Sequence, residues 1–307
     1  MPNLVMLAVV VVGVVVALLV FRKWPRSVPD LPRRVTTLAV VGVGLALVIE
    51  VVVLASGNWP FQSISHPAPF GWLSSIPGEW QFVAPLVGGV VASVLLSVPA
   101  PARARRDGAA LARRTPFTFV TFPWLITTAA LVAVAVLLAV AGGLASQPDE
   151  NGHYTMWMQD SGLGDVGRLI YGWSFSGPSL VLLLLLAVTT LVGLALIARP
   201  ALADSSEEDV AIRRVRSRTL LATACGAVLI HVGAVLIFFA YTANLSAGVP
   251  VGKAVVPVYP PFAILAPVFL GLGVATIIIG FVLWFRLLIE QLTAANRAPK
   301  GNATHAH

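Results

Sequence analysis

Charged residues are scarce in this sequence: Asp, Glu, Lys and Arg make up 11% of its 307 residues, whereas hydrophobic residues make up 58%. An ordinary soluble domain carries about 25% charged residues, so this composition cannot cover a water-soluble globule and indicates a protein of the lipid bilayer. The polar residues gather in short clusters and leave no stretch long enough for a separate soluble domain. A soluble ATPase motor, kinase or dehydrogenase domain is thereby excluded.

The chemical motifs of common enzymes are also lacking. The only cysteine, Cys225, lies in an apolar run, so no intrachain disulfide is expected. The chain has no HExxH, no GxxxxGK[ST], no CxxC and no GxGxxG opening a helix after a strand. The segment around Ser174 misses the nucleophile-elbow pattern, because Ser176 stands where that pattern needs glycine. We therefore predict no enzyme activity and no cofactor.

Long apolar runs, by contrast, are frequent. A bilayer core about 30 Å thick needs roughly 20 apolar residues in a helix, and seven segments meet this requirement. The sequence predicts an all-α, polytopic membrane helix bundle in one domain over 1–290, with a polar, disordered cytoplasmic tail over 291–307. The predicted spans lie near residues 4–21, 36–55, 82–98, 119–145, 177–198, 219–243 and 262–285. No lysine lies in the last of them, which argues against a retinal-binding rhodopsin.

The basic residues indicate the orientation of these spans. The segments 22–35, 99–118 and 199–218 hold five Lys or Arg each, and the tail from Arg286 holds three more. The alternate loops hold only Arg168 and Lys253. Cytoplasmic loops carry the excess of basic residues, so the N-terminus is predicted outside and the C-terminus inside a bacterial cytoplasmic membrane. The net charge of +7 is thus an orientation signal, and no nucleic acid partner is expected.

The eight tryptophans give a second indication of the span boundaries. Indole rings favour the membrane interface, and all eight lie near predicted span ends or in outer loops. We therefore expect them to be interfacial, with positions 24, 124 and 284 on the inside and positions 59, 72, 80, 157 and 173 on the outside.

Two ionisable residues lie well inside the predicted spans, Glu50 and His231. An intramembrane ionisable group is costly and is a functional candidate by default. Counted from the cytoplasmic end at about 1.5 Å per residue, the two lie at similar depth. We predict a hydrogen-bonded intramembrane pair that takes up a proton or organises a polar pocket. The alternative is that Glu50 lies near the outer interface and that His231 is a neutral core histidine bonded to a backbone carbonyl or hydroxyl.

The outer segment 146–176 is rich in acidic and aromatic residues. His153, Met156 and Met158 within it offer imidazole and thioether ligands suited to Cu(I). A copper site is one interpretation, and an interfacial Met-Trp-Met anchor in an amphipathic segment is the other. The glycines between Asp160 and Gly167 do not match the oxygen spacing of an EF-hand and are interpreted as a flexible turn.

A charged stretch precedes the sixth span. Ser205 with Glu208 matches a capping box, so the helix is expected to begin before the membrane. Its arginines are candidates for contact with a soluble protein partner or with anionic lipids of the bilayer, where each basic residue contributes about 1 kcal/mol. They are Arg213, Arg214, Arg216 and Arg218.

Small residues four positions apart recur in the spans, and this spacing allows close helix packing in lipid. The matches are Gly13 with Ala17, Gly42 with Ala46, Gly88 with Ala92, and Ala222 with Gly226. In a chain so rich in alanine and glycine they favour a bundle without identifying an interface.

Three classes of function are compatible with these features. The first is a permease-like or accessory subunit of a membrane transport complex. The second is a sensor or signalling protein that reads the outside through its outer loops. The third is an enzyme that uses outer-loop acidic residues, which ranks last because no catalytic spacing is present. The sequence identifies neither a transported solute nor a ligand.

Overall fold

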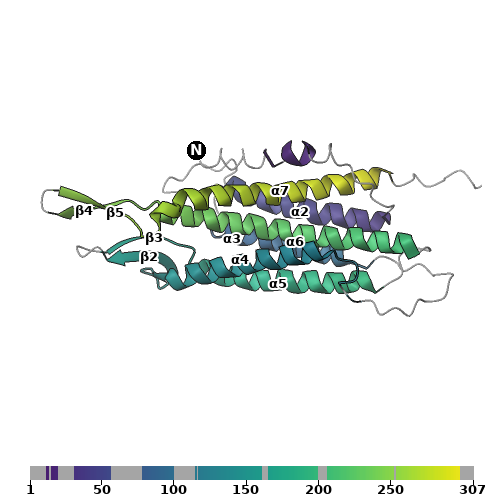
Figure 1. Ribbon diagram of the computed structural model, residues 1–307, viewed down its shortest axis with the longest axis horizontal. Helices are drawn as coiled ribbons and strands as arrows, with labels where there is room; N and C mark the ends of the chain where they lie inside the picture. The colour runs from purple at the N-terminus through teal and green to yellow at the C-terminus, as the bar shows by residue number, and fades with distance from the viewer. Residues whose placement is uncertain are drawn as a thin grey trace, which may run out of the picture.

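The structure, a computed structural model, places six long helices side by side, with short strands beyond one end of the bundle (Figure 1). The residues that it describes are 12–13, 15–19, 31–56, 78–99, 115, 117–160, 165–199, 206–251 and 254–297.

The helices agree with six of the seven predicted spans. Each is long and apolar enough to cross a membrane, which indicates a membrane-embedded bundle. The remaining predicted span, 4–21, falls largely outside the described residues, although 12–13 and 15–19 are helical. The six helices are α2 (Arg33–Ser56), α3 (Trp80–Ser97), α4 (Phe122–Ala145), α5 (Trp173–Ala198), α6 (Ser206–Ala243) and α7 (Ala266–Arg297). As predicted, α6 begins well before its apolar part.

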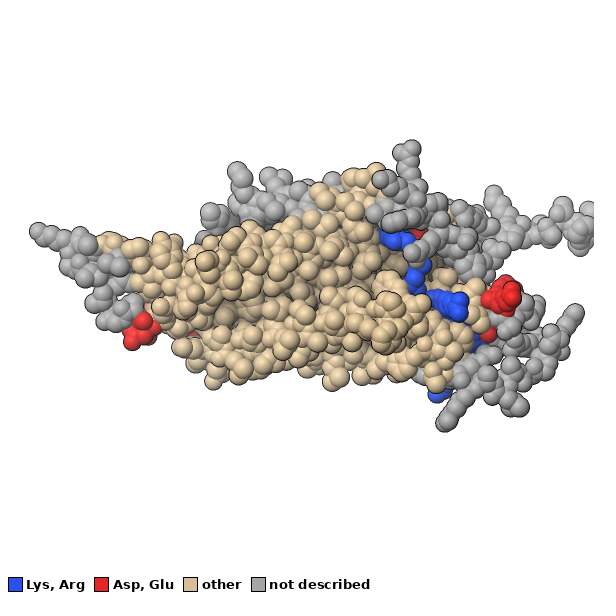
Figure 2. Space-filling view, viewed as in Figure 1, with Lys and Arg blue, Asp and Glu red and all other residues tan. Residues whose placement is uncertain are grey.

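Helix α6 is the centre of the bundle. Its apolar part is almost entirely buried, whereas α4 and α5 expose about half of their leucine, valine and isoleucine side chains. A helix that is apolar on every side is stable only when protein or lipid surrounds it. Figure 2 shows a middle zone without visible charged side chains, and the coloured arginines gather toward one end. We call this the arginine end and the opposite one the strand end.

Small residues set the closest helix contacts. A Cβ added at Gly42 would lie 3.2 Å from Ala92 Cα, and one added at Gly88 would lie 3.1 Å from Ala46 Cα. Two of the small-residue patterns seen in the sequence therefore pack against each other between α2 and α3. Helices α6 and α7 meet in the same antiparallel way, with Gly226 against Gly280 and Gly233 against Gly273.

The strand end adds β-structure that the all-α prediction lacks. The strands β1 (Gln147–Pro148), β2 (Tyr154–Asp160) and β3 (Asp165–Leu169) form an antiparallel sheet in that order. A second antiparallel pair joins β4 (Ala247–Val251) to β5 (Ala254–Val258). The predicted turn between Asp160 and Gly167 is therefore shorter than expected, and its residues 161–164 lie outside the described part of the chain.

Two further predictions at the arginine end need correction. Helix α7 continues to Arg297, so residues 291–297 are helical rather than part of a disordered tail, while 298–307 lie outside the described residues. Trp284 does not face the lipid: its ring is fully buried against Gly226, and its Nε1 donates to the carbonyl of Thr223 at 3.0 Å. Because Gly226 has no side chain, it leaves the space that this indole ring fills in the core.

Candidate functional site

Glu50 on α2 and His231 on α6 are both buried, with 2% and 0% of their surface exposed. The Nδ1 atom of His231 lies 2.7 Å from the carbonyl oxygen of Phe82. A carbonyl only accepts, so Nδ1 carries the proton and Nε2 presents a lone pair. Nε2 and Glu50 Oε2 have no hydrogen-bond partner. No hydrogen bond thus joins these two described side chains, and His231 follows the alternative of a core histidine bonded to a carbonyl.

The two residues nevertheless lie level with the same turns of α3. The α2–α3 contacts pair Gly42 with Ala92 and Ala46 with Gly88, and continuing this antiparallel register places Glu50 beside Ala84. The ring of His231 is bonded two residues away, at Phe82. The expectation of similar depth is therefore consistent with the helix register.

A cluster of aromatic rings surrounds His231. The ring of Phe82 lies 4.9 Å from that of Tyr171 and 5.3 Å from that of Phe238, and Tyr171 lies 6.1 Å from the imidazole. Phe175 on α5 completes the contact at 5.6 Å from Phe82. These rings belong to α3, α5, α6 and the segment before α5, so the imidazole is enclosed where three helices and the strand end meet.

Several buried polar atoms near this cluster also lack partners. They are both side-chain polar atoms of Gln81, the hydroxyl of Ser176, and the hydroxyl of Tyr171, which lies close to Ser179 without a hydrogen bond of good geometry. Burial raises the pKa of the Tyr171 hydroxyl, which keeps it protonated and able to donate. We call Glu50, Gln81, Tyr171, Ser176 and His231 the polar set.

Most buried polar atoms in proteins are hydrogen-bonded, so these orphans are an unusual feature of the fold. Sequence reasoning missed the three uncharged members of the polar set, because Gln81, Tyr171 and Ser176 lie near helix starts, where polar residues are ordinary. Pro85 is a local signal that could have pointed there: it lacks the N–H that would bond the carbonyl of Gln81.

The arginine end holds a second group of buried charges. Arg213 is fully buried, and its Nε and Nη2 each donate to Asp209 at 3.0 Å. Its Nη1 donates to the carbonyls of Ile197 and Ala198 at 2.9 and 2.5 Å. The last carbonyls of a helix have no partner within the helix, so Arg213 closes the end of α5.

Arg216 caps the end of α3 in the same way. It is 5% exposed, and its Nη2 donates to the carbonyls of Leu96 and Val98 at 3.2 and 2.8 Å. Because Arg213 and Arg216 are three residues apart, they share one face of α6, which is turned inward. The prediction that these two arginines contact lipid or a soluble partner is therefore wrong.

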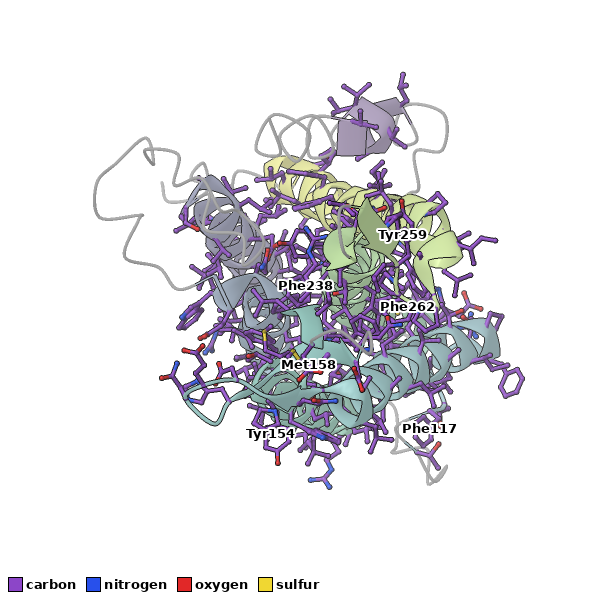
Figure 3. All side chains as sticks on the ribbon, turned by 90° about the vertical axis from the view of Figure 1, so that its left-hand side faces the viewer. Phe117, Tyr154, Met158, Phe238, Tyr259 and Phe262 are labelled. Carbon is purple, nitrogen blue, oxygen red and sulfur yellow. The ribbon has the colours of Figure 1, made fainter. Side chains whose placement is uncertain are left out.

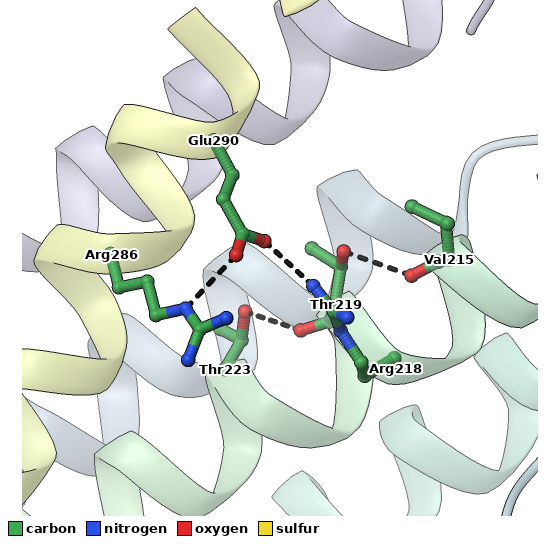
Figure 4. Close-up of polar contacts among 6 residues, drawn as sticks. All are labelled: Val215, Arg218, Thr219, Thr223, Arg286 and Glu290. Carbon is green, nitrogen blue, oxygen red and sulfur yellow. Dashed lines mark hydrogen bonds and ion pairs between the residues drawn. The ribbon is translucent and has the colours of Figure 1, made fainter. Parts of the chain in front are cut away.

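Arg214 and Arg218 lie on a different face of α6 from the two buried arginines. Arg214 is exposed, and Arg218 is partly exposed and donates to Glu290 on α7 at 2.7 Å. Arg286 donates to the second oxygen of the same carboxylate at 2.9 Å (Figure 4). Glu290 is 4% exposed, so two arginines compensate one buried carboxylate and tie α6 to α7. A lipid or partner contact remains a prediction for Arg214 and Arg218.

The predicted copper ligands are at the strand end. Met156 and Met158 share one face of β2, and both side chains pack on Gly167 of β3. Met158 Sδ lies where a Cβ atom of residue 167 would be, and Met156 Cε lies 3.4 Å from that position. Figure 3, seen from the strand end, places Met158 over the middle of the bundle. The imidazole of His153 is directed to Asp149 instead, with Nδ1 3.9 Å from Oδ2. The copper site stays a prediction.

Asp149 organises the turn before β2. Its Oδ1 accepts the backbone N–H groups of Asn151 and His153, each at 2.9 Å, and its Oδ2 accepts the hydroxyl of Thr155 at 3.2 Å. These donors lower the pKa of the Asp149 carboxyl below its ordinary value, and the N–H of His153 contributes most.

We expect the turn at Asp149 to open in acid. A carboxyl with a lowered folded-state pKa stabilises the fold above its ordinary pKa of about 4 and loses that effect as the pH falls through the lower value. Amide hydrogen exchange at Asn151 and His153, corrected for intrinsic rates, should therefore accelerate below about pH 4. Asp149→Asn keeps the acceptor oxygen but cannot titrate, so its protection should be independent of pH. An unchanged acid response in this variant would contradict the assignment.

The strand end is joined directly to α6. The guanidinium of Arg168 on β3 lies 3.6 Å from the ring centroid of Tyr241, a cation–π contact. Thr242 donates to the carbonyl of Leu169 at 2.7 Å, and Trp157 on β2 packs 5.3 Å from Phe262 before α7. One continuous helix thus connects the three-stranded sheet to the buried arginines at the opposite end.

No protein-family model matches this chain, no curated protein is significantly similar to it in sequence, and no solved structure is significantly similar to it in fold. Functional inference therefore depends on the site itself.

Proposed function

We propose that this protein is a permease-like or accessory subunit of a transport complex in a bacterial cytoplasmic membrane, with the arginine end in the cytoplasm. The observation that carries the proposal is the polar set, in which Glu50 and His231 are buried at similar depth and each keeps one polar atom without a partner. Buried ionisable residues within membrane spans mark ion and proton pathways.

The chemistry of the polar set suits proton uptake. His231 Nε2 presents a lone pair, and Glu50 Oε2 can accept or carry a proton. The hydroxyls of Tyr171 and Ser176 and the amide of Gln81 can relay hydrogen bonds nearby. In this proposal a shift of α3 at Pro85, where the helix lacks one backbone hydrogen bond, brings the two ionisable groups into contact during the transport cycle.

We expect Glu50→Gln and His231→Phe each to reduce proton uptake about tenfold, corresponding to about 1.4 kcal/mol. The measurement uses the purified full chain with its co-purifying partners in proteoliposomes that contain a pH-sensitive dye. Thr276→Val is the matched control, because this span hydroxyl is bonded only to carbonyls of its own helix. If the effects of the two substitutions add without interaction in the double variant, the pair does not act as a unit. Unchanged uptake in both single variants would contradict the proposal.

A sensor is the second candidate, favoured by the contacts that join the strand end to α6. A ligand that moves β3 would pull on Tyr241 and Thr242 and so on the helix that carries the buried arginines. Mild detergent extraction followed by identification of stoichiometric partners separates the two candidates. A transport subunit is expected to bring an ATPase or channel partner, whereas a sensor is expected to bring a kinase, protease or transcription regulator.

A further inference from the structure

A hollow of about 400 Å³ opens between α4, α5 and α6 in the half of the bundle nearer the arginine end. Its wall is apolar apart from two threonines, and Ala129, Ala133 and Ala187 keep it open because their side chains are small. Ala129 and Ala133 lie on the exposed face of α4, so the hollow faces the surrounding lipid.

A second hollow, of about 290 Å³, adjoins the first on the side of the arginine end. We call it the lower hollow and the first the upper hollow. The two share Leu221, and the consecutive residues Trp124 and Leu125 line the lower and upper hollow in turn. The lower hollow differs in chemistry, because Arg214 and Arg218 line it beside the ring of Trp124.

One face of α6 forms the back of both hollows. Arg214, Arg218, Leu221, Ala224 and Val228 line them at spacings of three or four residues, which places all five on one side of the helix. This face is basic at the arginine end and apolar above it. The inward pair, Arg213 and Arg216, is on a different face, where it is occupied by the carbonyl groups of α5 and α3.

The dimensions match one leaflet of a bilayer. Arg218 and Val228 are ten residues apart, about 15 Å along a helix, and half of a hydrocarbon core about 30 Å thick is the same length. A molecule with an anionic head beside the two arginines would thus carry its chains along the full height of the upper hollow.

One threonine of the apolar wall has a hydroxyl without a hydrogen-bond partner. Thr190 is 5% exposed, lines the upper hollow and has no partner for its hydroxyl. Its neighbour Thr189 donates to the carbonyl of Leu185 at 2.9 Å, the usual solution for a threonine in a membrane helix. Thr190 lacks such a bond, and its hydroxyl is buried within the protein.

We propose that the two hollows form one binding site for a single anionic phospholipid of the leaflet at the arginine end. The phosphate lies against Arg214 and Arg218, and an acyl chain fills the space between α4 and α5. Arg218 also holds Glu290, so occupancy of this site acts on the contact between α6 and α7.

A phospholipid fits better than a soluble anion because the larger hollow is apolar and opens toward lipid. It fits better than a peptide helix because a hollow of about 400 Å³ between packed helices is too small for a helix about 10 Å across. The site requires only a membrane-embedded bundle and is independent of the transport proposal.

The test titrates the delipidated full-length protein in zwitterionic micelles with phosphatidylglycerol, and in parallel with phosphatidylcholine and with inorganic phosphate. Bound lipid is counted by native mass spectrometry. We expect phosphatidylglycerol alone to bind with one-to-one stoichiometry. Arg214→Gln should weaken binding about fivefold, or about 1 kcal/mol. Arg34→Gln is the control, since Arg34 is exposed at the start of α2 and outside the hollows.

The apolar part of the site has its own test. Ala129→Leu fills the upper hollow and should weaken phosphatidylglycerol binding at least as much as Arg214→Gln. Ala130→Leu, its exposed neighbour on α4 outside the hollow, should leave binding unchanged. Equal weakening by Arg34→Gln and Arg214→Gln would overturn the proposal in favour of general charge attraction. Unchanged binding in Ala129→Leu, or equal binding of inorganic phosphate, would overturn it as well.

Discussion

Replacing Arg213 by methionine is expected to lower the free energy of unfolding by about 3–5 kcal/mol. Its guanidinium is fully buried, binds both oxygens of Asp209 and donates to two carbonyls at the end of α5. The substitution removes the cation from a buried carboxylate and leaves these carbonyls without that donor. Denaturant unfolding of the full chain in mixed micelles measures the loss.

Arg214→Met is the matched control for this prediction. Arg214 adjoins Arg213 on the same helix but is exposed, and surface substitutions usually change stability by less than about 0.5 kcal/mol. The double variant Arg213→Met with Asp209→Leu should recover part of the loss, because apolar replacement of both members of a buried ion pair is often tolerated. Equal stability of the Arg213 and Arg214 variants would contradict a structural role for the buried pair.

The second large effect is expected at the contact between α6 and α7. A Cβ at Gly273 would lie 2.8 Å from Ile237 Cγ1 and 2.9 Å from the carbonyl oxygen of Gly233, closer than real side chains approach. Gly273→Leu must therefore push the two helices apart, and we expect a loss of about 3 kcal/mol, at the upper end for overpacked cores. The same micelle unfolding measurement detects it.

Gly271 provides the control two residues away on α7. An added Cβ there meets nothing within 4 Å, so Gly271→Leu should be neutral or slightly stabilising, because glycine is a poor helix former. A comparable loss in both variants would mean that glycine is required for backbone reasons rather than for close approach.

The arginines of α6 illustrate how far sequence reasoning reaches. A helix turns once every 3.6 residues, so spacing alone divides them into two faces, Arg213 with Arg216 and Arg214 with Arg218. Spacing does not reveal which face is turned inward, because that depends on how α6 is rotated against α3 and α5. The positive charge of the segment predicts on which side of the membrane it lies, but it does not predict the role of each arginine.

The residues of the polar set could likewise be predicted from the sequence only in part. Glu50 and His231 were found because a charge in an apolar run is conspicuous, whereas the other members of the polar set are ordinary residues near helix starts. The partner of His231 is a backbone carbonyl on α3, 149 positions away in the chain. No side-chain pattern marks such an acceptor.

The sequence by itself determined membrane character, the positions of six long helices and the uneven distribution of basic residues, because each follows from local composition along the chain. Only the tertiary structure decided which glycines meet, why Trp284 is buried, that the segments at the strand end pair as strands, and that two hollows join beside Arg214 and Arg218. The physical reason is that these features arise between segments distant in the chain. Helix rotation and register place such segments together, and local composition leaves both quantities open.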